Sequence, residues 1–185
     1  MRILLKNVTL LSDLEKNCDI LIEDSKIKKV KDRIDDKEVD FLFKLDGKIT
    51  TPSLSFISQK SVDIRDYSYF QKLIKNGIKG GYTTYIFQLE KKDVKIEEIK
   101  KIDHIFSKNY VKGIFTGKDI EYKSEFIIFE KELQERKEKT ITNGEEGSLV
   151  IWDTNEYIDK DLLKIPYIVI SMGKIILREG KTIFI

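Results

Sequence analysis

The sequence contains few of the residues that disulfides and histidine-rich metal centres require. Among 185 residues there are one cysteine, one histidine, one tryptophan and two prolines. A single thiol, Cys18, cannot form an internal disulfide, and its place at the start of a strand pattern predicts a small buried apolar side chain. A zinc centre needs at least three suitable protein ligands, so carboxylates would have to replace the missing imidazoles. We therefore expect no metal site and no cofactor.

Long apolar runs and an excess of one charge are also missing. No stretch reaches the ~18 apolar residues of a membrane-spanning helix, and the first six residues, Met1-Arg2-Ile3-Leu4-Leu5-Lys6, do not start a secretion signal. We therefore expect a cytoplasmic protein without a membrane partner. The 34 Lys and Arg residues are offset by 32 Asp and Glu residues. This balance gives no strong field to attract nucleic acid, so we expect a mixed charged surface and no nucleic-acid partner.

Strand patterns are present at both ends of the sequence. Asp19–Glu23 and Lys26–Val30 are apolar runs on either side of a polar turn, which is typical of a hairpin. Further apolar runs lie before Pro52 and after Gly147. Turns are predicted where glycine can supply a positive φ, at Asp46-Gly47 (type I′), Met172-Gly173 and Glu179-Gly180.

The middle of the sequence alternates between strand and helix patterns, which predicts a parallel sheet with right-handed crossovers. Gly80-Gly81 would end the first helix in the left-handed region. The charged run 130–139 is typical of an exposed helix or a linker. The expected elements are a short strand at 54–57, a helix at 67–79, a strand at 83–89, a helix at 96–106, a strand at 110–115 and a fourth strand at 126–129.

These segments together resemble the cyclic amidohydrolases, especially dihydroorotase. The end segments resemble the two halves of that family's small β-sandwich, and Pro52-Ser53-Leu54 and Gly80-Gly81-Tyr82-Thr83-Thr84 match the two ends of its first barrel unit. The resemblance implies an α/β plus β fold, with a composite β-sandwich from residues 1–52 and 147–185. Residues 53–146 would be an inserted, truncated (β/α) barrel remnant, because about 95 residues fall short of the ~200 of a complete barrel.

The family's motif His-x-His-Leu-Arg-Asp has no histidine counterpart in this chain. Counting from Pro52 without gaps puts Ser58 and Lys60 at the two ligand positions. A three-residue insertion instead puts Ser61 and Asp63 there, and gives Arg65 the position of the family's substrate-carboxylate arginine. The resemblance therefore makes Arg65 and Asp63 candidate substrate-binding residues, and we predict no catalytic and no metal-binding residue.

Local structure offers another interpretation of the same residues. Asp63, Arg65 and Asp66 would form a polar cluster at the start of a helix, with Asp66 as its N-cap. His104 falls on the polar face of the second predicted helix. Phe129 stands where the family's strand ends in a third metal-binding histidine.

The resulting hypothesis is a catalytically inactive dihydroorotase-like protein that acts as a structural or regulatory subunit. Three or four parallel strands cannot close a barrel, so we expect a homo-oligomer or a partner protein to cover the open sheet. The resemblance implies aspartate carbamoyltransferase as candidate partner, which would link the protein to pyrimidine biosynthesis. Two alternatives stay open: a reduced-site amidohydrolase acting on a cyclic amide or carbamoyl acid, and a sensor that binds a carboxylate ligand through Arg65.

Overall fold

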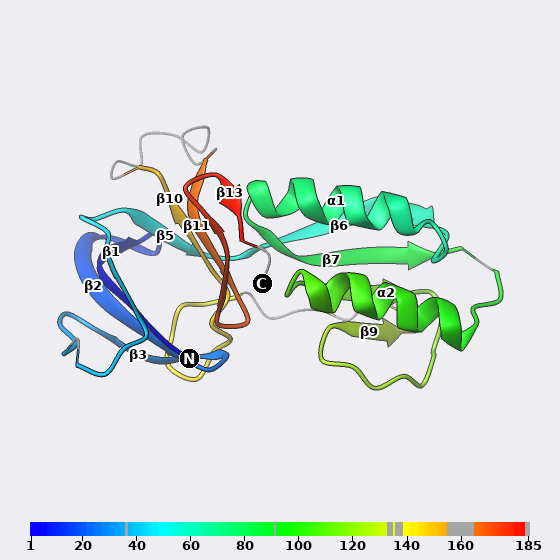
Figure 1. The fold of residues 1–185 in the computed structure, drawn as a ribbon, viewed down its shortest axis with the longest axis horizontal. Helices are drawn as coiled ribbons and strands as arrows, with labels where there is room; N and C mark the ends of the chain where they lie inside the picture. The colour runs from blue at the N-terminus through cyan, green and yellow to red at the C-terminus, as the bar shows by residue number, and fades with distance from the viewer. Residues whose placement is uncertain (36, 91, 133–134, 136–138, 155–164, 184–185) are drawn as a thin grey trace. The chain divides into compact units, whose positions relative to one another are not determined.

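The computed structural model describes residues 1–35, 37–90, 92–132, 135, 139–154 and 165–183. The described residues form two compact units (Figure 1). Unit 1 contains residues 1–53, 79–81 and 139–183, and unit 2 contains residues 54–78 and 82–138. Segments far apart in the sequence therefore fold together in unit 1.

Unit 1 holds one nine-stranded sheet among its described residues. Eight strands follow the spatial order β13-β12-β11-β10-β5-β1-β2-β3, and β4 pairs with β1 beside this path. The antiparallel pairing of β5 with β10 joins the strands of the first 52 residues to those that follow residue 148. The strands are β1 (Arg2–Leu10), β2 (Asp13–Glu23), β3 (Lys26–Lys31), β4 (Phe41–Lys44), β5 (Ile49–Pro52), β10 (Leu149–Trp152), β11 (Pro166–Ser171), β12 (Lys174–Arg178) and β13 (Lys181–Thr182).

The three predicted Xaa-Gly turns are confirmed by the backbone. Both residues of each pair have positive φ, which is the mirror-image turn geometry that suits twisted strands. Gly173 cannot be replaced without a shift, because a Cβ at this position would overlap the backbone carbonyl of Asp24. The hairpin of β2 and β3 is also confirmed, with Asp24 in the left-handed region at its turn.

The strands on either side of Asp46-Gly47 do not pair with each other. Instead β4 lies parallel to the first half of β1, and β5 lies parallel to its end. The Gly47 amide donates to the Asn7 carbonyl at 2.7 Å, which holds the turn against the middle of β1. The turn therefore lets two short strands lie one after the other along a longer one.

One apolar cluster contains residues from both halves of the nine-stranded sheet. Ile20 of β2 and Ile170 of β11, for example, belong to the same buried core. Cys18 joins this core as predicted, and burial raises the pKa of its thiol to about 11. The buried Asp19 carboxylate accepts hydrogen bonds from the backbone amides of Asn7 and Ile34, both at 2.9 Å, so it ties a loop to the sheet.

Unit 2 has the predicted alternation of strands and helices. Its four-stranded sheet has the order β6-β7-β8-β9, and all three strand pairs are parallel. Figure 1 shows α1 and α2 lying side by side along these strands. The elements are β6 (Leu54–Val62), α1 (Tyr67–Lys79), β7 (Tyr82–Leu89), α2 (Ile96–Lys108), β8 (Lys112–Thr116) and β9 (Ile127–Glu130).

The strand predicted at 54–57 is too short, because β6 continues to Val62. The pairing of β6 with β7 shifts between Ile57 and Ser61, which marks a bulge. Within it the Ser58 hydroxyl donates to the Lys60 carbonyl at 2.8 Å and accepts from the Lys60 amide at 3.3 Å. This local bonding lets a polar segment without strand periodicity continue as a strand.

An aromatic layer fills the space between the sheet of unit 2 and its two helices. Phe70 of α1 and Phe106 of α2 both contact Phe87 of β7, with ring centroids 5.0 and 6.4 Å apart, so both helices cover one face. Gly113 permits the close approach of Phe106, because a Cβ there would lie 2.8 Å from its ring. The rings of the layer belong to Phe70, Tyr85, Phe87, Phe106, Phe115 and Phe129.

The opposite face of this sheet carries a row of four isoleucines. Ile86 lies between Tyr85 and Phe87, whose rings face the helices, so its side chain points to the other face. The strand register aligns Ile57 with Ile86, Ile86 with Ile114, and Ile114 with Ile128. Each strand of unit 2 therefore contributes one isoleucine to the row.

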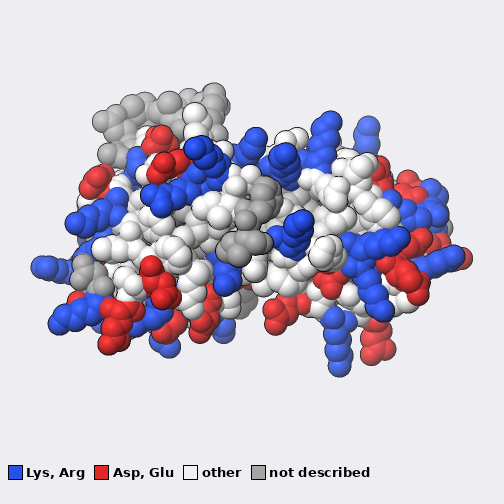
Figure 2. Space-filling model, viewed as in Figure 1, with Lys and Arg blue, Asp and Glu red and all other residues white. Residues whose placement is uncertain are grey.

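Two sequence predictions fall largely outside the described residues. They are the helix or linker at 130–139 and the end of the last strand, at Phe184 and Ile185. In the described part of the chain no helix is long and apolar enough to cross a membrane. Figure 2 shows basic and acidic side chains intermixed over both units on the face drawn, in keeping with the mixed surface that we expected.

Candidate functional site

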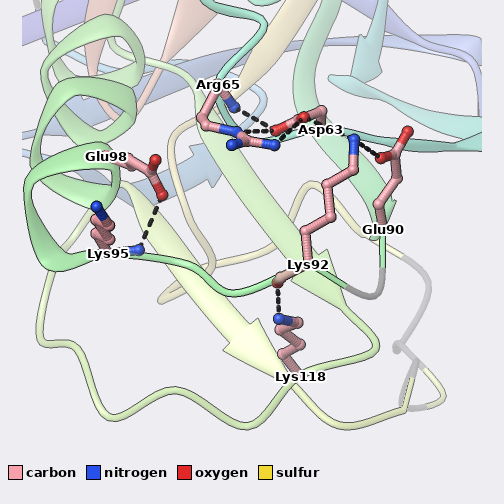
Figure 3. Close-up of polar contacts among 7 residues, drawn as sticks. All are labelled: Asp63, Arg65, Glu90, Lys92, Lys95, Glu98 and Lys118. Carbon is pink, nitrogen blue, oxygen red and sulfur yellow. Dashed lines mark hydrogen bonds and ion pairs between the residues drawn. The ribbon is translucent and has the colours of Figure 1, made fainter.

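A cluster of charged residues lies where the strands of unit 2 end. Asp63 directly follows β6, Glu90 directly follows β7, and Lys118 lies shortly after β8. In open parallel sheets, ligands bind outside the carboxyl ends of the strands. We call Asp63, Arg65, Glu90, Lys92 and Lys118 the carboxyl-edge cluster (Figure 3).

Asp63 is the centre of this cluster. Its Oδ1 accepts from the Arg65 Nε at 2.9 Å and from the Arg65 backbone amide at 3.0 Å, while its Oδ2 accepts from the second guanidinium nitrogen at 2.6 Å. This is a bidentate, charge-assisted contact of the kind that arginine forms with carboxylates. The substrate-binding pair suggested by the resemblance is thus an ion pair within one loop.

Lys92 adds a second cation from the next loop. Its Nζ lies 3.1 Å from the Asp63 Oδ2 and 2.6 Å from a carboxylate oxygen of Glu90. The Lys118 ammonium in turn donates to the Lys92 carbonyl. The loops that follow β6, β7 and β8 are therefore linked through one chain of polar contacts, as Figure 3 shows.

The contacts shift the protonation equilibria of the cluster. Hydrogen bonds from Arg65 hold the pKa of Asp63 well below its usual range, and the hydrogen bonds to Asp63 raise the pKa of Arg65. The hydrogen bond to Glu90, and to a smaller extent the one to Asp63, raises the pKa of Lys92. These shifts keep Asp63, Arg65 and Lys92 charged at neutral pH, so the three form fixed ion pairs.

The polar cluster predicted at the start of the first helix is present. The Asp66 Oδ1 accepts from the Tyr69 amide at 3.1 Å and from the Ser68 hydroxyl at 3.0 Å, which makes Asp66 the N-cap of α1. At α2 the N-cap residue is Lys95, and the side chain of Glu98 in the first turn accepts a hydrogen bond from the Lys95 amide at 2.8 Å. These carboxylates hold the first turns of both helices beside the carboxyl-edge cluster.

The other positions discussed from the sequence take ordinary structural roles. Ser58 and Lys60 bond to each other in the bulge of β6, and Ser61 pairs with Gln88 in the ladder that follows. His104 is exposed on α2, as expected. The ring of Phe129 stacks on Phe115 in the aromatic layer, with centroids 5.4 Å apart, so this position packs the core beneath the helices.

Sequence reasoning did not identify Glu90, Lys92 and Lys118. A usable signal was present, because each follows the end of a predicted parallel strand and such ends meet at one edge of a sheet. The sequence does not show in which direction these long side chains extend. A lysine in a loop is usually solvated, so a contact with Asp63 could not be predicted.

The cluster does not fit the metal centre that the resemblance implies. Within the described ranges, no group of three or more His, Cys, Asp and Glu side chains is arranged to hold a metal ion. Both oxygens of Asp63 already contact cationic groups, and a divalent cation placed there would be repelled by Arg65 and Lys92. The donor chemistry at this edge therefore suits an anion better than a cation.

Comparison with known proteins gives partial structural likenesses. No protein-family model and no curated protein matches the chain. Among solved structures, it is similar to a triazine hydrolase from Arthrobacter aurescens (16% identity, TM-score 0.47, 62% of this chain and 35% of that chain). It is also similar to an L-hydantoinase (dihydropyrimidinase) from Arthrobacter aurescens (18% identity, TM-score 0.46, 62% of this chain and 27% of that chain). The chain thus spans about a third of the length of the solved structures that it matches.

Proposed function

We propose that this chain is a dihydroorotase-like protein without hydrolase activity, and that it serves as a structural or regulatory subunit. The observation that carries the proposal is that the Asp63 carboxylate forms ion pairs with Arg65 and Lys92. Asp63 stands where the sequence resemblance puts a metal ligand, and its carboxylate is neutralised by two cationic side chains. Water activation by a bound cation would need the opposite arrangement, a negative pocket of several donors.

In this proposal the two units correspond to the two parts that the sequence resemblance implies. The nine-stranded sheet of unit 1 takes the place of the composite β-sandwich. The four parallel strands of unit 2 take the place of a truncated (β/α) barrel. Among the described residues no helix packs on the second face of this sheet, and its outer strands leave Ile57 and Ile128 exposed, which supports the role of a subunit in an assembly.

Metal content and hydrolase activity test the inactive character directly. The purified protein is incubated with zinc, manganese or iron, dialysed and analysed for metal, and its hydrolysis of dihydroorotate is measured in parallel. We expect less than about a tenth of an equivalent of metal, because the site is already ion-paired. A stoichiometric metal ion with turnover would establish the reduced-site amidohydrolase instead.

The identity of the partner needs a separate experiment. The chain is mixed with aspartate carbamoyltransferase from the same organism and examined by size-exclusion chromatography with light scattering. Co-elution at a defined stoichiometry supports the proposed link to pyrimidine biosynthesis. Independent elution of the two proteins would remove this enzyme as the partner.

A second function, the binding of a carboxylate ligand, is favoured by the exposure of the cluster. The Arg65 and Lys92 side chains are 48% and 54% exposed, so an incoming anion can reach both. Asp63 competes for the same donors, and we therefore expect Asp63→Asn to bind carboxylates more tightly than the unchanged protein. Thermal-shift titration with dihydroorotate and carbamoyl aspartate measures this. Equal shifts for the unchanged protein, Asp63→Asn and Arg65→Gln would exclude such a sensor.

A further inference from the structure

We infer that residues 119–126 form a latched strap: contacts with Asp103 of α2 hold it closed over a groove along β9, and their release opens this groove. The inference goes beyond the proposed function. It concerns access to β9, and it depends neither on the missing metal centre nor on the role of a subunit.

The strap takes the place that a third helix would have in unit 2. The crossovers from β6 to β7 and from β7 to β8 contain α1 and α2, whereas the crossover from β8 to β9 contains no helix, although the structure describes all of its residues, 117–126. Figure 1 shows this connection returning alongside β9. Its side chains alternate between exposed and half-buried from Asp119 to Phe126, so one side of an extended segment faces inward.

A groove of about 450 Å³ lies between the strap and β9. Its lining includes Ile120 and Tyr122 from the strap, and Ile127 and Phe129 from the strand. The two strand residues are only 1% and 9% exposed, and Phe129 belongs to the aromatic layer under the helices. A strap that moves away therefore uncovers apolar side chains of the core and widens the groove into an apolar pocket.

Both ends of the strap are fixed to the sheet by the backbone. The Gly117 amide donates to the Lys131 carbonyl at 3.1 Å, and the Gly113 amide donates to the Phe126 carbonyl at 2.8 Å. Lys118, just before the strap, is held in the carboxyl-edge cluster. Movement is therefore confined to the segment between these ends.

Asp103 holds the middle of the strap. Its Oδ2 accepts from the Tyr122 hydroxyl at 2.9 Å, and its Oδ1 accepts from the Ser124 hydroxyl at 2.6 Å. Hydrogen bonds to a carboxylate are roughly twice as strong as those between neutral groups. The Ser124 Oγ also accepts from the amides of Phe126 and Ile127, at 2.9 and 3.3 Å, so its donor and both lone pairs are used. One carboxylate on α2 thus fixes two inward side chains of the strap.

The strap itself buries little apolar surface. Its four inward side chains, Ile120, Tyr122, Ser124 and Phe126, are all half-buried, and none is fully enclosed. Segments with few buried apolar contacts open at a low cost in free energy. The closed position therefore depends on the bonds to Asp103 more than on packing, which is what makes this carboxylate a latch.

Limited trypsin digestion of the full-length chain tests the latch, because Lys123 is exposed in the middle of the strap. A protease needs a locally opened segment, so the rate of cleavage after Lys123 follows the open fraction. We expect Asp103→Ala to raise this rate by about tenfold or more, the effect of losing one hydrogen bond to a charged group. Asp103→Asn keeps hydrogen-bonding atoms and should raise it less. His104→Ala is the matched control, since it changes the exposed neighbour of Asp103, and it should leave the rate unchanged.

Two further measurements separate a latch from general destabilisation. Tyr122→Phe should raise cleavage in the unchanged background and have no effect once Asp103→Ala is present, because both remove the same contact. Hydrogen exchange of Asp103→Ala, followed by mass spectrometry, should be faster in residues 119–126 and unchanged in α1 and β7.

Three outcomes would overturn the inference. They are unchanged cleavage in Asp103→Ala, an equal rise in His104→Ala, and faster exchange spread evenly over unit 2. None of them bears on metal content or hydrolase activity, so the latch and the proposed function can fail separately.

Discussion

The side chains around Asp63 are held by two kinds of contact: one from a residue nearby in the sequence and one from a distant loop. Arg65 and Asp63 are two positions apart, so a local ion pair could be anticipated from the sequence, and the bidentate contact realises it. Lys92 reaches the same carboxylate from another loop, and no local pattern indicates this. The sequence therefore predicts the local half of the cluster, while the remainder depends on how the sheet aligns its loops.

The ion pairs of Asp63 predict a pH dependence of stability. An unfolded aspartate titrates near pH 3.9, and contacts with Arg65 lower the folded pKa. Their stabilising contribution is therefore complete above about pH 4, and it is lost as the pH falls toward the folded pKa, because the unfolded chain binds the proton first. We expect Asp63→Asn to be less stable than the unchanged protein at neutral pH, by a small and salt-sensitive amount, since the pair is near the surface.

Urea unfolding of both proteins between about pH 7 and pH 3 measures this effect. The difference between them should shrink on the acid side of about pH 4. Asp93→Asn, which changes an exposed aspartate in the loop before α2, is the control and should change little. A difference that is constant with pH would show that Asp63 acts through something other than its charge.

Gly77 is a second residue whose identity is set by packing. In a helix interior, Gly→Ala normally stabilises by about 1 kcal/mol. In α1, however, an added Cβ would overlap the hydroxyl and ring of Tyr85. We expect Gly77→Ala to lower the free energy of unfolding by about 1–3 kcal/mol, as overpacking does. Urea unfolding of Gly77→Ala, Tyr85→Phe and the double variant tests this. The double variant should lose less than the two single losses together, and simple additivity would refute the overlap.

At the level of elements, the positions of helices and strands were predicted better than the pairing between strands. The helix and strand patterns of unit 2 identified α1, α2 and β7, because each has an apolar periodicity that matches its structure. The full length of β6 was missed, because its bulge depends on Ser58 bonding to the backbone of Lys60. The parallel pairing of β4 and β5 with β1 was also missed, since strand pairing between distant segments leaves no local trace.

The cap of α1 predicts a specific loss of stability. Asp66 accepts hydrogen bonds from the first turn of the helix, so Asp66→Ala should cost about 1 kcal/mol. Asp66→Ser keeps an acceptor and should recover most of this loss. Denaturation midpoints of the three proteins give the comparison. Equal losses for Ala and Ser would mean that Asp66 contributes through its charge and not through the cap.

At the scale of the whole molecule, charge is plentiful but evenly divided. The 34 basic and 32 acidic residues leave a net charge of +2, and Figure 2 shows both signs distributed over the visible face. Such a surface allows many weak surface ion pairs. On the face drawn it shows no extended patch of one sign that would attract a polyanion.

This balance predicts weak binding to nucleic acid. Fluorescence anisotropy with a labelled DNA duplex should show no saturable binding at physiological salt, because affinity for the phosphate backbone depends on clustered lysine and arginine. A random-sequence single-stranded RNA serves as the parallel probe. Saturable binding with a steep salt dependence would indicate a basic surface on a face that Figure 2 does not display.

The burial of Cys18 has a practical consequence for measuring how this molecule opens. Its thiol is the sole one in the chain and lies inside the core of unit 1. A thiol reagent can react there only when that core is transiently exposed. The rate of Cys18 labelling therefore measures how often unit 1 opens locally. Because unit 2 has no cysteine, events confined to its sheet leave the labelling rate unchanged, so the rate reports on unit 1 alone without any change to the protein.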